Sequence, residues 1–150
     1  MWRVFPTTGS LNGRVRPPGA YGAAMVLHGP SGQPAREQLL TTDSREVGDA
    51  VVVTVRGEVD VMTAPRLRDA VARAFDAPEA GAVVLDLTGV TFLGSNGLAA
   101  LVDAVTEARQ RREPLRVVVD DTRPVLRPLQ LTGLDSLLAL YHSVEEALAR

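Results

Sequence analysis

The sequence predicts an α/β fold, with a single domain over residues 39–150 built on a mixed, mostly parallel β-sheet. The first observation is the element order, in which strand-like and helical segments follow one another as β-β-α-β-α-β-α-β-α. The second is that residues 82–87 and 115–119 are almost continuously apolar, as in strands covered on both faces. A long helical segment lies between these two strands, so together they predict a right-handed βαβ unit.

The domain begins with two strands, at residues 39–45 and 50–56. The second strand, AVVVTVR, is rich in β-branched residues, which favour extended structure. Val47-Gly48-Asp49 lies between the two strands and supplies residues suited to a tight turn, so we expect a hairpin.

The first helix is predicted over residues 64–75. Thr63 precedes it as a candidate N-cap, and Pro65 suits the first turn, where a backbone N–H has no helical partner. One apolar stripe at helical spacing is formed by Leu67, Ala70, Val71 and Ala74.

The second helix is predicted over residues 95–111, and shorter elements follow the strand at 115–119. They are a helix near 124–131, a strand at 137–141 and a last helix opening at Ser143, where Glu146 completes a capping box, S-x-x-E. The apolar face of the second helix is predicted to contain Leu98, Leu101, Val102 and Val105.

Residues 1–38 are predicted to form a disordered leader, because the first 40 residues hold 6 of the 13 glycines and 5 of the 10 prolines. These 40 residues contain four arginines and one glutamate, a charge of +3, whereas the rest of the chain carries −5. Two alternatives stay open. The apolar run at 20–27, although broken by Gly22, is a weak candidate for a signal peptide, and translation could instead begin at Met25.

Composition excludes several classes of protein. No run approaches the roughly 20 apolar residues of a membrane helix, so we expect no membrane span. The net charge of −2 argues against a nucleic-acid-binding protein. The chain has no cysteine and two histidines, and it lacks the glycine-rich nucleotide motifs, so no metal and no cofactor is expected.

Catalysis is also not expected. Ser95 lies in Leu93-Gly94-Ser95-Asn96-Gly97, but a nucleophile elbow needs glycine where Leu93 stands, and His142 would have to serve as the base. The acidic pairs Glu58 with Asp60 and Asp120 with Asp121 follow predicted strands, where carboxylates commonly end strands or cap helices. The sequence therefore predicts a protein that is not an enzyme.

Two motif stretches point to a family. Arg56-Gly57-Glu58-Val59-Asp60 is followed by Thr63-Ala64-Pro65-Arg66-Leu67, and later come residues 83–87, 90–98 and 101–102. In this order and spacing they resemble the STAS domain of bacterial anti-sigma factor antagonists. The resemblance covers roughly residues 40–150 and includes Leu131-Thr132-Gly133-Leu134 and the closing helix at 143–148.

The resemblance implies a cytoplasmic partner-switching regulator of transcription. Such a protein binds an anti-sigma factor, usually an ATP-using serine kinase, and is released when the kinase phosphorylates a serine at the start of the second helix. Here that position is Ser95, and a phosphate beside Glu58, Asp60 or Asp86 would meet like charge. The implied partner-binding residues are Glu58, Asp60, Thr63, Gly94, Ser95, Asn96 and Gly97.

One departure from the family pattern leaves alternatives open. The family often has Asp-Ser-Ser-Gly where this chain has Gly94-Ser95-Asn96-Gly97, so the acid is missing. Ser95 could simply cap the helix, and Thr91 is a second possible phosphate acceptor. The chain could also be a STAS-type binding subunit of a lipid-transport or sensory complex that needs no phosphorylated serine.

Overall fold

The computed structural model describes residues 3–5, 39–77, 81–121 and 123–149, and their strands form one sheet. The sheet order is β1-β3-β4-β5-β6-β7; β1, β3 and β4 pair antiparallel, and β4, β5, β6 and β7 pair parallel. The predicted mixed, mostly parallel sheet is therefore confirmed. The strands are β1 (Arg3–Phe5), β3 (Leu40–Val47), β4 (Ala50–Val59), β5 (Ala82–Leu93), β6 (Leu115–Val118) and β7 (Ala139–Tyr141). The helices are α2 (Ala64–Phe75), α3 (Ser95–Arg111), α4 (Arg123–Thr132) and α5 (Val144–Leu148), with a 3-10 turn, η2, at Leu134–Ser136.

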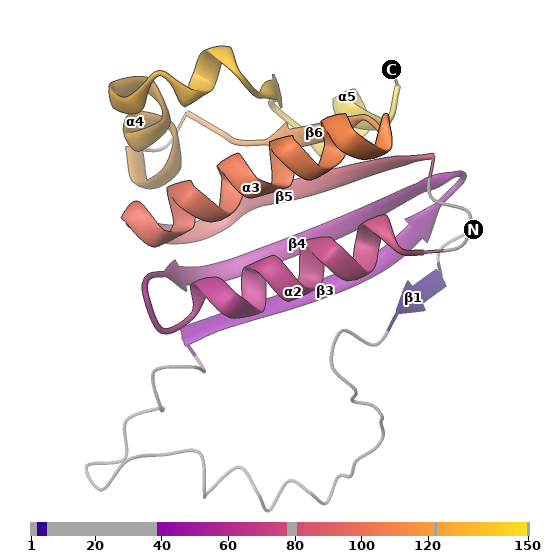
Figure 1. The fold of residues 1–150 in the computed structure, drawn as a ribbon, viewed down its shortest axis with the longest axis horizontal. Helices are drawn as coiled ribbons and strands as arrows, with labels where there is room; N and C mark the ends of the chain where they lie inside the picture. The colour runs from indigo at the N-terminus through magenta and orange to yellow at the C-terminus, as the bar shows by residue number, and fades with distance from the viewer. Residues whose placement is uncertain (1–2, 6–38, 78–80, 122, 150) are drawn as a thin grey trace, which may run out of the picture.

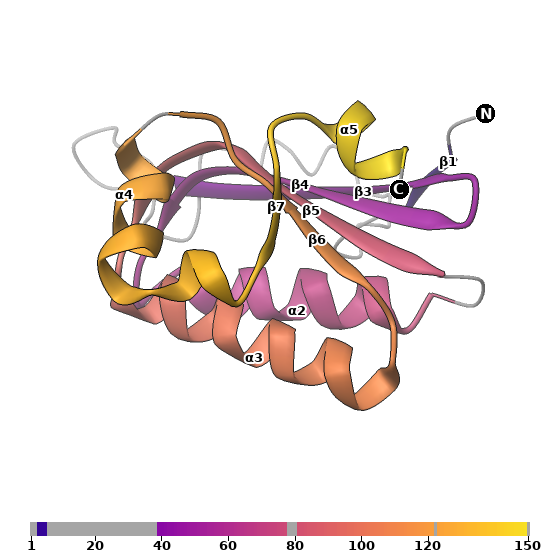
Figure 2. The same ribbon diagram turned by 90° about the horizontal axis from the view of Figure 1, so that it is seen from above.

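Helices cover both faces of the sheet. In Figure 1, α2 and α3 lie side by side along the strands, and Figure 2 shows α5 on the opposite face. Alternate strand residues divide accordingly: Val53 and Leu85 belong to the large core under α2 and α3, whereas Val52 and Val84 pack with Ala147 of α5. The helix α4 adds its own buried apolar residues to the large core.

Most predicted elements are confirmed. The hairpin turns at Gly48, which has a φ of +62°, and α2 and α3 begin and end where predicted. The strands β4 and β5 run further than predicted, through Val59 and Leu93, with register shifts around Gly57. Gly57 has a φ of +111°, and a Cβ there would lie 1.8 Å from the Leu39 carbonyl oxygen, so only glycine allows this close approach.

The predicted apolar face of α3 is partly wrong. Leu101 is buried, but Leu98 and Val105 are only half-buried and Val102 is 40% exposed. Leu98 and Val105 still pack against the large core, so Val102 is the predicted residue that faces away from it, and small residues occupy most of the fully buried positions of α3. The residues of α3 that are buried are Gly97, Ala100, Leu101, Ala104 and Ala108.

The two ends of the chain differ from the predictions in detail. Arg3–Phe5 forms a strand inside the predicted leader, because the outer edge of β3 offers unpaired N–H and C=O groups to a short segment. The rest of that leader, with the run at 20–27 and Met25, lies outside the described residues. At the other end, residues 137 and 138 follow the turn η2 and are not part of β7.

The predicted capping box at α5 is half confirmed. The Ser143 hydroxyl accepts a hydrogen bond from the Glu146 N–H at 3.0 Å, as expected of an N-cap. The Glu146 carboxylate reaches one residue further back than predicted and accepts from the His142 N–H at 2.7 Å.

Candidate functional site

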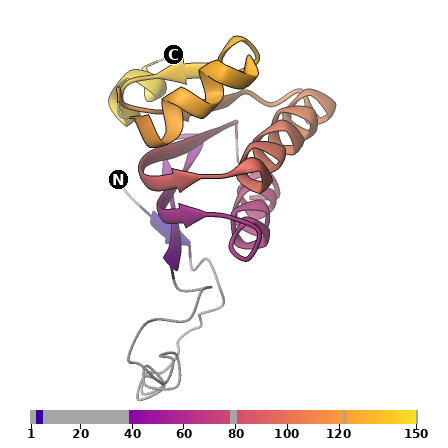
Figure 3. The ribbon, with the colours of Figure 1, turned by 90° about the vertical axis from the view of Figure 1, so that its left-hand side faces the viewer.

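The two loops that carry the predicted binding residues meet at one end of the sheet. They follow β4 and β5, which are adjacent parallel strands with Glu58 opposite Phe92 and Val59 opposite Leu93. The Gly94 N–H donates to the Val59 carbonyl at 2.9 Å and joins the loops directly. Figure 3 looks at this end, where the arrowheads of β4 and β5 lie side by side and the chain turns into α2 and α3.

Ser95 is the first residue of α3 and is exposed. The N-cap position belongs to Gly94, in extended conformation, and no side chain caps the helix, so the capping role considered for Ser95 does not occur. The first turn contains no acidic residue. Its free N–H groups and the positive end of the helix dipole therefore make this position favourable for a phosphate.

The loop between β4 and α2 is held by a hydrogen-bond network around Thr63, which is fully buried. The Thr63 hydroxyl donates to the Glu58 carbonyl at 2.7 Å and accepts from the Asp60 N–H at 2.9 Å. The Asp60 carboxylate in turn accepts from the backbone N–H groups of Met62 and Thr63. Thr63 occupies the predicted N-cap position, but its side chain shapes the loop and does not cap α2.

Gly97 is also buried, and it seats the first turn of α3 on the sheet. A Cβ at this position would lie 2.5 Å from Leu93 Cδ1 and 2.8 Å from Val59 Cγ1. Thr63 and Gly97 are both predicted partner-binding residues. In the structure both are buried: Thr63 holds the loop after β4, and Gly97 allows α3 to lie close to the sheet. The predicted site residues at the surface are Ser95 and Asn96, which are exposed, and Glu58, Asp60 and Gly94, which are half-buried.

Exposed apolar side chains lie on the elements that meet at this end of the sheet, and sequence reasoning missed them. The Phe92 ring is 51% exposed and lies against Gly94, since a Cβ there would be 3.1 Å from Phe92 Cε2. Val102 lies two turns beyond Ser95 on the same side of α3. We call the following four residues the apolar patch: Val61, Met62, Phe92 and Val102.

The described residues contain six large exposed hydrophobic side chains, and four of them lie on the loop after β4, at the end of β5 or on the first turns of α3. Exposed apolar residues that lie close together on a protein are candidates for an interaction site. The sequence signal was weak: Val61 and Met62 lie in a loop, and Val102 fits the apolar helical stripe that predicts burial.

Asp86 does not contribute to this site. It alternates along β5 with the large-core residues Leu85 and Leu87, so it lies on the sheet face opposite α3. Its carboxylate accepts hydrogen bonds from the N–H and the hydroxyl of Thr88. The predicted acids that lie at the end of β4, next to the loop of Ser95, are therefore Glu58 and Asp60.

The arrangement does not support catalysis by Ser95. His142 follows β7, which is separated from β5 by β6, and its charged neighbours are Asp121 at 3.9 Å and Glu146 at 3.8 Å. Within the described ranges, no hydrogen bond joins His142 to Ser95. The same residues contain no group of three or more His, Asp or Glu side chains that could hold a metal, and no helix long and apolar enough to cross a membrane.

Comparison with known proteins finds a matching family and relatives that are named as anti-sigma factor antagonists. Residues 41–147 match the STAS domain. RsfB, an anti-sigma-F factor antagonist of Mycobacterium tuberculosis, is 32% identical over 109 residues, covering 73% of this chain and 87% of that protein. An anti-sigma-B factor antagonist of Listeria monocytogenes is 30% identical over 92 residues, covering 61% of this chain and 79% of that protein.

A solved structure agrees with these relatives. The crystal structure of an anti-sigma factor antagonist from Mycobacterium paratuberculosis matches with a TM-score of 0.67 and 37% identity, covering 77% of this chain and 95% of that one. The STAS match runs from β3 to α5 and includes both loops of the site. On the agreement of sequence, fold and site, the chain belongs to the STAS domain family.

Proposed function

We propose that this protein is an anti-sigma factor antagonist that works in the cytoplasm, binds an anti-sigma factor with serine kinase activity, and is released when that kinase phosphorylates Ser95. One observation carries the proposal: Ser95 is exposed at the uncapped start of α3 and lies beside the apolar patch. The named relatives are anti-sigma factor antagonists, which supports the same class of partner. We assign binding to residues 39–150 and give the leader at 1–38 no part in it.

The apolar patch supplies the binding energy of the unmodified protein. Phe92 and Val102 are large, exposed apolar side chains that precede and follow Ser95 in the chain, and burying such a side chain contributes about 1.5–3 kcal/mol. The surrounding half-buried Glu58 and Asp60 form a polar rim. A partner with an apolar centre and a basic or hydrogen-bonding edge complements this surface.

Phosphorylation of Ser95 opposes that binding without unfolding the domain. It adds a charge of about −1.5 to −2, which the N-terminus of α3 tolerates in the free protein. In the complex the same charge would be enclosed between apolar surfaces and near Glu58 and Asp60. A loss of 3 kcal/mol of binding free energy corresponds to roughly 150-fold weaker affinity.

Where the family often has an acid, at position 94, this chain has a glycine against which the Phe92 ring lies. An acidic side chain there would begin with a Cβ 3.1 Å from the Phe92 ring, so that ring would have to move. Gly94 leaves room for Phe92 to lie over the loop. The chain therefore presents an apolar contact where the family often has an acid, and the proposal assigns kinase recognition to that contact.

The test uses the anti-sigma kinase of the same organism with ATP and mass spectrometry of the product. We expect phosphate on Ser95, tight binding without release for Ser95→Ala, and weak binding for Ser95→Asp. Ser136→Asp, at an exposed serine in η2, is the matched control and should bind normally. Phosphate on Thr91 instead, or equal binding of Ser95→Asp and Ser136→Asp, would contradict the proposed switch.

The second candidate is a STAS-type binding subunit of a lipid-transport or sensory complex. The observation in its favour is Gly94, because a surface that binds through apolar contacts needs no acid for kinase recognition. Affinity capture with the unmodified protein separates the two. Recovery of transport components without an anti-sigma kinase would favour the second candidate.

A further inference from the structure

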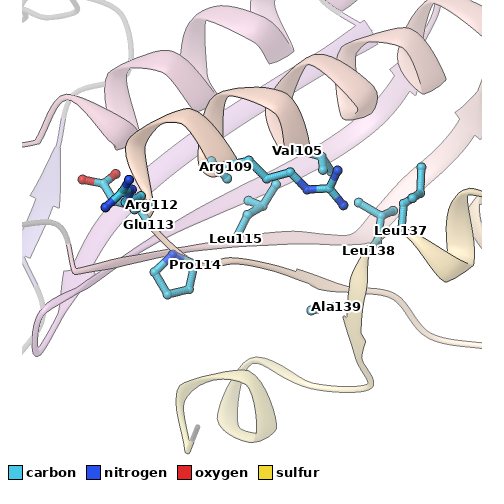
Figure 4. Close-up of a pocket in the computed structure, with 10 residues that line it drawn as sticks. Val105, Arg109, Arg112, Glu113, Pro114, Leu115, Leu137, Leu138 and Ala139 are labelled. Carbon is cyan, nitrogen blue, oxygen red and sulfur yellow. The ribbon is translucent and has the colours of Figure 1, made fainter.

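A separate pocket lies at the far end of α3 from Ser95. Figure 4 shows it between the last turns of α3, the start of β6 and the segment that enters β7. Its volume is about 360 Å³, at the lower end of the range for small-molecule sites. Val105, its residue nearest to Ser95 along the helix, is ten residues away, or about 15 Å. The pocket is therefore distinct from the surface around Ser95.

The pocket has apolar walls and a positive charge. Seven of its ten lining residues are apolar, and Leu137, one of them, is 51% exposed. Its three charged residues are Arg109, Arg112 and Glu113, with a formal sum of +1. In Figure 4 the Arg109 side chain extends from α3 toward Leu137 and Leu138, while Arg112 and Glu113 lie at the other end.

Arg109 differs from its neighbour Arg111. The Arg111 guanidinium binds Asp76 and Glu107, and these hydrogen bonds, that of Asp76 first, raise its pKa. Arg109 has no ion pair within the part of the chain that the structure describes. A guanidinium beside an apolar hollow, with its donors available, is suited to bind a carboxylate through charge-assisted hydrogen bonds.

The backbone of Arg112 gives a second, independent observation. It has φ +57° and ψ +37° at the C-cap of α3, and it is the one non-glycine residue with a positive φ in the described ranges. The Glu113 N–H donates to the Ala108 carbonyl at 3.0 Å, which closes a helix end that normally carries glycine. A strained arginine at the edge of a pocket is the kind of position that function maintains.

We propose that this pocket binds a small amphipathic monoanion, namely a carboxylate on an aliphatic chain. The carboxylate binds Arg109, and the chain lies along Leu115, Leu137 and Leu138 and covers the exposed part of Leu137. A single negative charge matches the net +1 of the lining residues.

The test uses the full chain and octanoate, followed by NMR of the backbone amides. We expect saturable shifts at Ala108, Leu115 and Ala139, all lining residues. Acetate, which has the charge without the chain, should cause no saturable shift. Octanamide, which has the chain without the charge, should bind at least about tenfold more weakly. Absence of saturable octanoate binding, or equal affinity for octanoate and octanamide, would overturn the proposal.

Two variants locate the ligand within the pocket. Arg109→Gln should weaken octanoate binding at least about tenfold, whereas Arg127→Gln, at an exposed arginine of α4 outside the pocket, should leave it unchanged. Equal affinities of the Arg109 and Arg127 variants would overturn the assignment of the carboxylate to Arg109.

Discussion

Replacing Thr63 by valine should destabilise the domain although the two side chains have nearly the same shape. The Thr63 hydroxyl makes main-chain hydrogen bonds at 2.7 Å to the Glu58 carbonyl and at 2.9 Å from the Asp60 N–H. Thr63→Val leaves both groups without this partner, and a buried unpaired group costs about 1–3 kcal/mol. Because neighbouring loop residues are partly exposed, we expect a total loss of about 2–3 kcal/mol.

The measurement is thermal unfolding followed by circular dichroism. A loss of this size in a domain of this length corresponds to a fall in melting temperature of roughly 10 °C. Thr63→Ser is the matched control, since it keeps the hydroxyl and removes one methyl group, worth about 0.8 kcal/mol. If Thr63→Val proved as stable as Thr63→Ser, the loop would not depend on this hydroxyl and our account of it would be wrong.

Two further predictions concern the packing and the surface of the site. Gly97→Ala should destabilise the domain by about 1–3 kcal/mol in urea unfolding, since its Cβ would lie 2.5 Å from Leu93 Cδ1; unchanged stability would show that α3 can shift freely. Val61→Asp should weaken binding of the anti-sigma factor at least about tenfold in titration calorimetry and leave the melting temperature within about 2 °C, because Val61 is 65% exposed. Leu131→Asp, at a 70% exposed position on α4, is its control, and equal affinities of these two variants would place the binding surface elsewhere.

The elements of the fold were largely predictable because local signals agree with the tertiary structure. In α2 the predicted apolar stripe is buried, the proline lies in the first turn, and the observed limits of the helix are the predicted ones. The face of α3 was not predictable in the same way, since periodicity gives most weight to large apolar residues. Its core positions are occupied by Gly97, Ala100 and Ala104, which depends on how closely the sheet and α2 approach.

The sequence predicted which segments form the candidate site, but not which of their residues are buried supports and which are exposed. The resemblance grouped Ser95 and both loops in one surface, and in the structure these two loops are joined at one end of the sheet. The burial of Thr63 and the exposure of Phe92 depend on neighbours that are distant in sequence or on the turn of a strand at its end. The hydrogen-bond partners of Thr63 are only three and five residues away, but its burial follows from tertiary packing, which a single sequence does not contain.

The direct junction between the two loops is a main-chain hydrogen bond, from the Gly94 N–H to the Val59 carbonyl. Every residue except proline carries the N–H and C=O groups of such a bond, so this junction does not constrain the side chains at Val61, Met62 and Phe92. Val61, Met62 and Phe92 can therefore change during evolution with little cost to the fold, while Thr63 and Gly97 cannot. A duplicated copy of such a domain can acquire a new partner by substitution at a few exposed positions, and copies within one cell can in this way avoid cross-reaction with each other's partners.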